Sequence, residues 1–190
     1  MNLAQQMKEF FDQYHVAPLE EWSSFARLLK PISYSKNHII KEEFATESHL
    51  HFIIKGSAGS FVWKDNNAVC LDLLYENDFL SDYMSLLTQK PSPIYIQAIE
   101  NIDVVSITGE QLQRVYHHVP MAERVGRIAA ESLFIHKQMQ QIDLLTLTAE
   151  QRYQKLLDRQ PQIILRTPQK HIASYLGVTP ESFSRIRRNI

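Results

Sequence analysis

The stretch "TPQKHIASYLGVTPESFSRIRRNI", residues 167–190, has the pattern of two short helices joined by a tight turn. Pro168 suits a first helical turn, and Gly177 can take the positive φ that ends a helix and redirects the chain. Thr179 can cap a second helix that has Pro180 at its first position. The stretch therefore predicts a helix-turn-helix unit.

The side chains of this unit divide into an inner and an outer set. The expected core is Ile172, Ala173, Leu176, Val178, Phe183 and Ile186. The spacing from Ala173 to Gly177, and on to Phe183 and Ile186, is that of a DNA-binding helix-turn-helix. On the outer face, Arg185 can read guanine and Glu181 can accept from cytosine. Gln169, Lys170 and His171 are placed to meet phosphate at the start of the first helix, where backbone N–H groups also point.

The net charge of −1 conceals an uneven distribution of charged residues. Residues 146–190 carry eight Lys or Arg and three Asp or Glu, whereas residues 1–145 carry 12 and 18. A positive C-terminal part on a negative body is expected when one end meets a polyanion, although a solvated basic face would give the same count.

Composition and motifs exclude several classes of protein. The hydrophobic content of 44% is ordinary for a soluble protein, and no apolar run is long enough to span a membrane. The N-terminus lacks a signal core, and Cys70 is the only cysteine, which fits a reducing cytoplasm. No catalytic triad, metal-ligand spacing, P-loop or dinucleotide turn is recognisable. We expect a cytoplasmic protein that is not an enzyme and has no metal.

The first two thirds of the chain change pattern once. Residues 3–30 have apolar residues at helical spacing, interrupted by Pro18, and predict two short helices. Residues 32–107 consist of short β-branched and aromatic runs separated by turn residues, with a hairpin signal at Asn66–Asn67. Many strands without intervening helices predict an antiparallel roll or barrel. A helical spacing over residues 80–87 interrupts the strands and suggests a pocket there.

A long helix is predicted to begin near Pro120. It carries a heptad seam with spacings of three and four, made of Val125, Ile128, Ser132, Ile135, Met139 and Ile142. The seam could instead pack on the roll of the same chain, but Ala129, Leu133 and Phe134 offer a second apolar face for that contact, so pairing with a second copy is favoured. Thr148 and Gln151 form a capping box that starts a further helix, which ends before Pro161.

This order of parts resembles the Crp/Fnr family of bacterial transcription regulators over nearly the whole chain. "HLHFIIKGSAGSF" (residues 49–61) is similar to the family's "LYFIxxGxVxxF" strand pair, and "SRIRR" (residues 184–188) matches the end of its recognition helix. The resemblance implies an α+β fold with a cyclic-nucleotide-binding-like antiparallel β-roll (residues 1–119), a dimerisation helix (120–145) and a helix-turn-helix domain (146–190).

The same resemblance implies a dimeric transcription regulator whose partners are double-stranded DNA, a second copy of the chain and RNA polymerase. Thr179, Glu181, Ser182 and Arg185 fall on positions that the family uses for phosphate and base contacts. Pro180 replaces a residue that is often arginine in members that respond to cyclic AMP, so we do not expect the familiar half-site.

The effector site departs from the family's phosphate-binding cassette. An ungapped alignment places Ser81 at its glycine, Asp82 at its glutamate, Ser92 at its arginine and Pro93 at its serine or threonine. Without the arginine, a buried cyclic phosphodiester would cost several kcal/mol. We therefore expect no binding of cyclic AMP or cyclic GMP, and the cysteine and histidine content favours neither an iron–sulfur cluster nor haem. The candidate effector pocket is Ser81, Asp82, Tyr83, Ser92 and Pro93.

The family usually continues past the recognition helix into a β-hairpin wing, whereas the printed sequence stops at Ile190. We therefore expect Arg187 and Arg188 to carry more of the contact with the DNA backbone. The alternative is a ligand-binding or protein-interaction module with a vestigial helix-turn-helix. The altered cassette favours this alternative, and the Glu181–Arg185 face opposes it.

Overall fold

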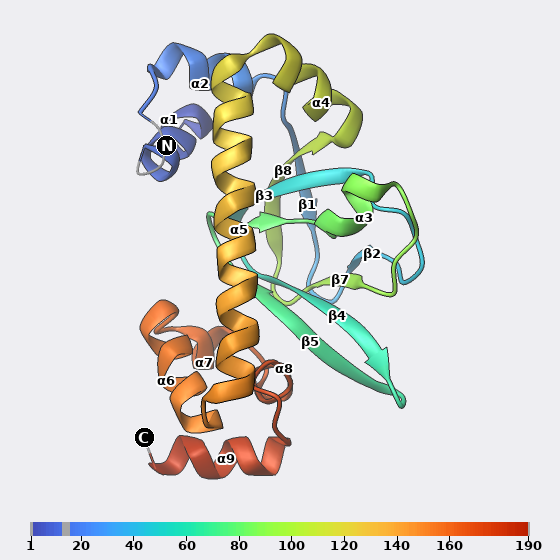
Figure 1. Ribbon diagram of the computed structural model, residues 1–190, viewed down its shortest axis with the longest axis vertical. Coiled ribbons are helices and arrows are strands. Elements are labelled where there is room, and N and C mark those ends of the chain that lie inside the picture. The colour runs from blue at the N-terminus through green and yellow to red at the C-terminus, as the bar shows by residue number, and fades with distance from the viewer. Residues whose placement is uncertain (1, 13–15, 190) are drawn as a thin grey trace.

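A computed structural model describes residues 2–12 and 16–189 and consists of a β-roll flanked by helices (Figure 1). The strands are β1 (Lys30–Tyr34), β2 (Ile39–Lys41), β3 (His49–Lys55), β4 (Ala58–Lys64), β5 (Asn67–Leu74), β6 (Phe79–Leu80), β7 (Tyr95–Ala98) and β8 (Ile102–Thr108). They form two antiparallel sheets with the orders β1-β8-β3-β6 and β2-β7-β4-β5. The predicted antiparallel roll is confirmed.

Strand β3 shows why the first sheet has both faces covered. Ile53 points into the roll and packs with Val104 of β8, whereas Phe52 points outward to the N-terminal helices. Alternate residues of a strand face opposite sides, so one run of apolar residues serves both cores. Leu50 faces outward like Phe52 and packs under the helix that follows β8.

The helices surround the roll and extend beyond it. They are α1 (Leu3–Phe11), α2 (Leu19–Ala26), α3 (Tyr83–Thr88), α4 (Gly109–His118), α5 (Pro120–Thr146), α6 (Ala149–Arg159), α7 (Ile163–Arg166), α8 (Gln169–Tyr175) and α9 (Pro180–Asn189). Helix α5 runs beside the roll from α4 to the C-terminal helices, and α9 crosses the far end of the molecule (Figure 1). None of the helices in the described residues has both the length and the apolar character that a membrane crossing requires.

Most local predictions are confirmed, with small shifts. Helix α5 begins at Pro120, and α6 starts with the predicted capping box at Thr148. The hairpin turn was predicted one residue too late, because Asp65 and Asn66 are the two residues with positive φ. Leu80 belongs to β6 and not to the helix after it, which begins at Tyr83. Helices α4 and α7 were not predicted from the sequence.

Helix α5 does not use its faces as the sequence predicted. Val125 is buried in its own chain, in the cluster that joins α5 to α1, α2 and the roll, so it does not belong to a free seam. Phe134 is 69% exposed, so the second apolar face does not cover the roll. Polar side chains make that contact: Lys137 pairs with Asp72 of β5, and Gln140 donates to the Leu71 carbonyl at 3.0 Å.

Candidate functional site

The C-terminal unit has the predicted helix-turn-helix geometry. Gly177 follows α8 with a φ of +69°, in the left-handed region that glycine adopts at low cost. At the start of α9, the Ser182 N–H donates to Thr179 Oγ1 at 3.2 Å, which is a side-chain cap. Phe183 is fully buried and meets the Tyr153 ring edge-on at 5.1 Å between centroids. The predicted inner set is buried or half-buried throughout.

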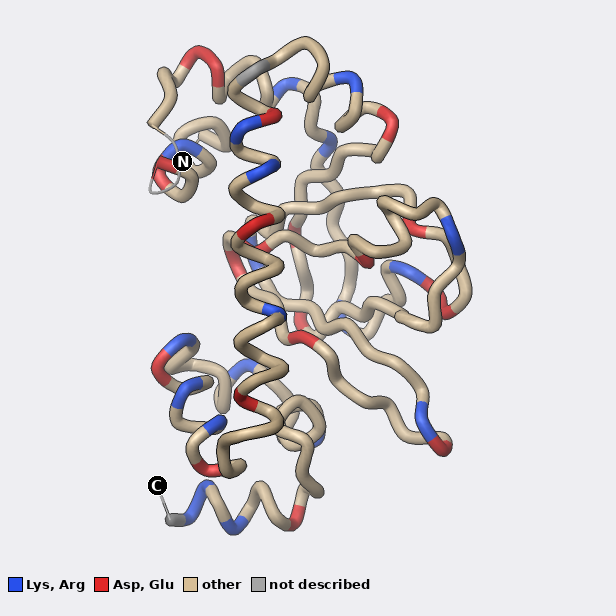
Figure 2. The backbone as a smooth tube through the Cα atoms, in the orientation of Figure 1, with Lys and Arg blue, Asp and Glu red and all other residues tan. Residues whose placement is uncertain are grey.

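The outer face of α9 is exposed and polar. Arg185 is exposed, and its guanidinium donates to Ser182 Oγ at 3.2 Å, while Arg188 donates to the Ser184 carbonyl at 3.3 Å. Backbone hydrogen bonding at the helix start, followed by the Thr179 hydroxyl, lowers the pKa of Glu181, which stays ionised. These side chains border an open depression of the surface, and Figure 2 shows the cations along α9.

Several cations of the C-terminal part serve structure and not the outer face. Arg152 donates to the Leu147 and Leu176 carbonyls, and Lys155 pairs with Asp143 at 2.7 Å. Arg159 donates to the Leu73 carbonyl, and Arg166 pairs with two glutamates of the roll. The number of Lys and Arg residues in 146–190 is therefore larger than the number of cations that can contact a partner. The exposed cations that remain are Lys170, Arg185, Arg187 and Arg188.

Helix α8 is docked on the β4–β5 hairpin of the roll. Ser174 Oγ accepts the Cys70 N–H at 2.8 Å and donates to the Ala68 carbonyl at 3.2 Å, so it binds the edge of β5 as a further strand would. The His171 ring packs on the Phe61 ring at 4.9 Å between centroids. The predicted phosphate contact of His171 would therefore require α8 to leave the hairpin, whereas Gln169 and Lys170 are exposed.

Arg166 fixes α7 to the roll. Its guanidinium donates to both carboxylate oxygens of Glu76 at 2.7 and 2.8 Å and to Glu100 at 2.6 Å, and it lies 5.3 Å over the Tyr75 ring. Burial is the largest single influence and raises the pKa of Glu76 and Glu100. The hydrogen bonds from Arg166, those from backbone N–H groups to Glu76 and from Ser57 to Glu100, and the Arg166 charge together outweigh it, so both pKa values lie below the ordinary value. Two-point binding of this kind fixes orientation as well as distance.

The docking of α8 should weaken in acid through His171. Burial, and then the Lys170 charge, lower its pKa from 6.5 to about 4. Between these two pH values the His171 ring is neutral in the folded protein and protonated in the unfolded chain. The associated stability is complete above pH 6.5 and falls as the pH drops toward 4. Urea unfolding between pH 7 and 5 should show that His171→Phe takes up about one proton fewer on unfolding than the wild type.

The matched control for this measurement is His117→Phe, because His117 is exposed on α4. It should keep the pH dependence of the wild type. If the free energy of unfolding changes with pH equally in His171→Phe and in the wild type, then the His171 ring is not held neutral in the folded protein.

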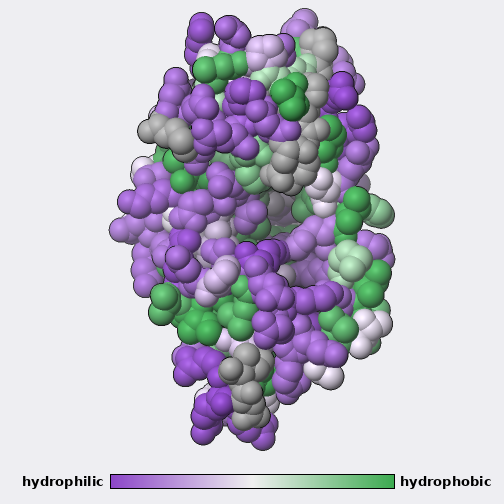
Figure 3. All heavy atoms as spheres, turned by 90° about the vertical axis from the view of Figure 1, so that its left-hand side faces the viewer, coloured by the Kyte–Doolittle hydropathy of each residue, from purple (hydrophilic) through white to green (hydrophobic). Residues whose placement is uncertain are grey.

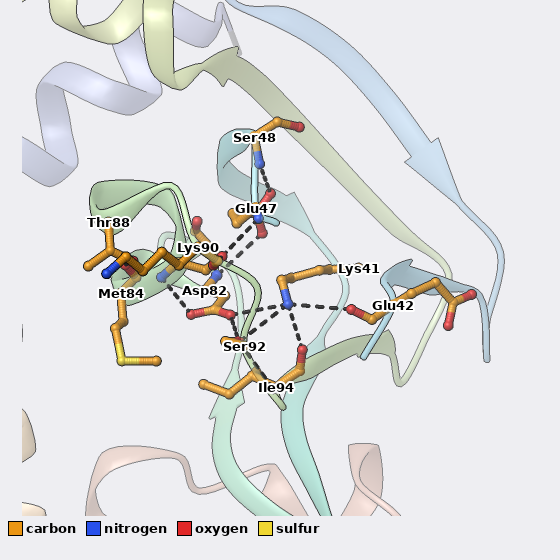
Figure 4. Close-up of polar contacts among 12 residues, drawn as sticks. Lys41, Glu42, Glu47, Ser48, Asp82, Met84, Thr88, Lys90, Ser92 and Ile94 are labelled. Atoms are coloured by element: carbon orange, nitrogen blue, oxygen red, sulfur yellow. Dashed lines mark hydrogen bonds and ion pairs between the residues drawn. The ribbon is translucent and has the colours of Figure 1, made fainter. Parts of the chain in front are cut away.

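The candidate effector pocket contains a buried ion pair (Figure 4). Lys41 Nζ lies 3.2 Å from Asp82 Oδ2, with both side chains almost fully buried, and it donates to the Ile94 carbonyl at 2.7 Å. Ser92 donates to the same carboxylate oxygen of Asp82. No cation was predicted for this site, because Lys41 comes from β2, outside the cassette.

Glu47 completes this buried cluster. Its carboxylate accepts the Ser48 and His49 N–H groups at 2.9 Å each and the Asp82 N–H at 3.3 Å. The structure thus brings together Asp82 and Ser92, as predicted, and adds Lys41 and Glu47, which were not predicted. Of the other predicted pocket residues, Ser81 donates to the His49 carbonyl, Tyr83 is half-buried and Pro93 is exposed.

The remaining part of the α5 seam lies on the surface. Ile135 is 62% exposed, Met139 47% and Ile142 42%, while Ile128 and Ser132 are half-buried. Figure 3 shows apolar side chains along the edge of the molecule at mid-height, among polar ones. A row of exposed apolar residues on one helix face is typical of a surface that meets a partner.

Comparison with known proteins rests on structure. No family model and no curated protein matches the sequence. Similar solved structures include FixK2 from Bradyrhizobium japonicum (TM-score 0.73, 19% identity, covering 85% of this chain and 83% of that one). The regulator CLP of Xanthomonas campestris, described as c-di-GMP responsive, has a TM-score of 0.67 and 14% identity, covering 90% of this chain and 91% of that one. The catabolite activator protein of Thermus thermophilus has a TM-score of 0.60 and 17% identity, covering 95% of this chain and 85% of that one. The fold is that of the Crp/Fnr regulators.

Proposed function

We propose that this chain is a DNA-binding transcription regulator that acts as a homodimer. The observation that carries the proposal is the exposed face of α9, where Glu181, Arg185 and Arg188 project from a helix whose other side is buried. Side chains of these types read base edges and phosphates when a recognition helix lies in the major groove. The likeness to Crp/Fnr regulators in fold supports the same reading.

The exposed part of the α5 seam supports pairing with a second copy. In a two-fold dimer whose axis runs along α5 past Ile135 and Met139, the apolar rows of both chains would be buried and both α9 helices would lie at the same end of the pair. Two recognition helices about 34 Å apart can enter successive major grooves on one side of DNA. RNA polymerase as a further partner stays a prediction.

We also propose that the roll does not respond to cyclic AMP or cyclic GMP. The only cation described beside Asp82 and Ser92 is Lys41, and that ammonium is already paired with Asp82. A cyclic phosphodiester would have to break this buried pair or remain without a cation, and both are unfavourable. The cation that α5 directs to the roll, Lys137, is also already paired, with Asp72 of β5.

DNA binding should be steeply dependent on salt, and Arg185→Ala should flatten sequence preference. Selection from a random DNA pool should yield a two-fold symmetric site for the wild type. At that site Arg185→Ala should lose about 1–3 kcal/mol of discrimination, whereas its binding to unrelated DNA should change little. Fluorescence anisotropy over a salt series measures the affinity for the selected site and for unrelated DNA. Cyclic AMP should alter neither affinity.

Lys64→Ala is the matched control, because Lys64 is an exposed cation of the β4–β5 hairpin and lies outside α9. It should retain sequence preference. Absence of DNA binding at low salt by a protein shown to be dimeric would contradict the proposal and favour a ligand-binding or interaction module with a vestigial helix-turn-helix.

A further inference from the structure

Strand β5 is an edge of its sheet, because among the described strands it pairs with β4 alone. An edge strand leaves backbone N–H and C=O groups without partners in the sheet. Side chains of α5, α6 and α8 bind these groups at 2.8 to 3.3 Å. The bonds join Ser174 to Cys70 and Ala68, Gln140 to Leu71, and Arg159 to Leu73. The edge is therefore the place where the roll holds both the long helix and the helices that follow it.

The segment that leads into α8 is fastened to the roll next to this edge. Tyr75, which follows β5, shares a 2.6 Å hydrogen bond with the Thr167 hydroxyl, and both residues are buried. Arg166, beside Thr167, pairs with Glu76 and Glu100 of the roll. We call the β5 edge with all these contacts the head seat, where the head is α6 to α9, residues 149–189.

The head seat also has an apolar part. One buried cluster contains Phe61 and Leu73 of the roll together with Ile172 and Phe183 of the head. Lifting the head from the roll would expose part of this cluster to water and would also break the hydrogen bonds, and both changes are unfavourable. The seat therefore gives the head one orientation on the roll.

This orientation leaves the outer face of α9 open. Arg185 and Arg188 are exposed, and α9 lies at the end of the molecule away from the roll (Figure 1). In a two-fold dimer along α5, both outer faces then point the same way. Two heads that bind one DNA molecule lose freedom when they are ordered on it, and a seat that orders them beforehand reduces that loss.

We propose that the head seat positions each α9 for a two-fold symmetric DNA site, with Ser174 and Arg166 as positioning residues. This rests on the DNA-binding function proposed above and adds that the roll sets the direction in which α9 points. The alternative is that the helices only cover an edge that could otherwise pair with another chain. In that case, loosening the seat would leave the affinity for DNA unchanged.

The test variant is Arg166→Met/Ser174→Ala in the full chain, which removes the polar contacts of both side chains and leaves α9 and the exposed row of α5 unaltered. Spin labels on Lys55→Cys and Gln162→Cys, two exposed positions, report the distance between roll and head without DNA, in the presence of excess unlabelled chain. Cys70 is buried and stays unlabelled. Pulsed electron paramagnetic resonance should give a narrow distance distribution with the seat intact and a broad one in the variant. A narrow distribution in both would overturn the proposal.

The affinity for DNA, from fluorescence anisotropy, supplies the second measurement. The variant should bind the symmetric site at least tenfold more weakly than the wild type. Its affinity for a single half-site should stay within about twofold of the wild type, which also shows that its head is folded. Ser24→Ala is the control, because the Ser24 hydroxyl is exposed on α2 and donates within its own helix, and this variant should bind as the wild type does.

Two results in DNA binding would count against the proposal in different ways. If the variant has a broad distance distribution and binds the symmetric site as tightly as the wild type, or more tightly, the head seat does not position α9, while the DNA-binding function stands. If the wild type binds no DNA, the proposed function itself is contradicted, and the positioning role with it.

Discussion

Replacing Lys41 with methionine should destabilise the protein by roughly 3–5 kcal/mol, the usual effect of removing one partner from a buried ion pair. Methionine keeps the length and apolar stem of lysine, so packing changes little. The Asp82 carboxylate would stay in the same enclosed place, with hydrogen bonds from Ser92 and the Ser85 N–H but no cation. The free energy of unfolding in urea, followed by tryptophan fluorescence, measures the loss.

Two further variants separate the loss of the pair from the loss of a lysine. In Lys41→Met/Asp82→Asn both charges are absent, and most of the stability should return, because replacing a whole buried pair is often close to neutral. Lys36→Met, at an exposed lysine of the same roll, should change the free energy of unfolding by less than about 0.5 kcal/mol. A loss below about 1 kcal/mol for Lys41→Met would mean that water reaches Asp82.

The features that the sequence predicted well depend on neighbouring residues. The capping box at Thr148, the turn at Gly177 and the inner residues of α8 and α9 follow from spacings of three or four positions, which fix local geometry. The roll also follows from a local signal, the short β-branched and aromatic runs separated by turn residues. Such signals do not depend on what the rest of the chain does.

The features that the sequence did not predict depend on distant residues. Lys41 meets Asp82 across two sheets, and Ser174 meets Cys70 on β5, 104 positions earlier. No local pattern encodes either contact. The assignment of faces on α5 failed for the same reason: Val125 packs with the N-terminal helices, and Lys137, not an apolar residue, reaches the roll. A lysine and a glutamate close to apolar strands were the available signals for Lys41 and Glu47.

The second large effect is expected from Ile135→Glu on α5. Ile135 is the most exposed residue of the proposed seam, and a two-fold axis there would bring two copies of the new carboxylate together. Burying like charges in an apolar contact is strongly unfavourable, so the variant should sediment as a monomer at concentrations where the wild type is a dimer. The monomer itself should stay folded, because Ile135 contributes little to the core of its own chain.

The loss of the dimer should appear in DNA binding as a loss of roughly 100-fold or more for a symmetric site, because the second head then no longer binds as part of the same molecule. Binding to a single half-site should stay as it is in the wild type, since the α9 face is unchanged. Leu165→Glu is the control: Leu165 is 87% exposed on α7, away from the seam, and this variant should remain dimeric. If Ile135→Glu stays dimeric and binds the symmetric site as tightly as the wild type, the dimer interface does not lie at this part of α5. If the wild type itself is a monomer, the exposed row on α5 does not pair with a second copy.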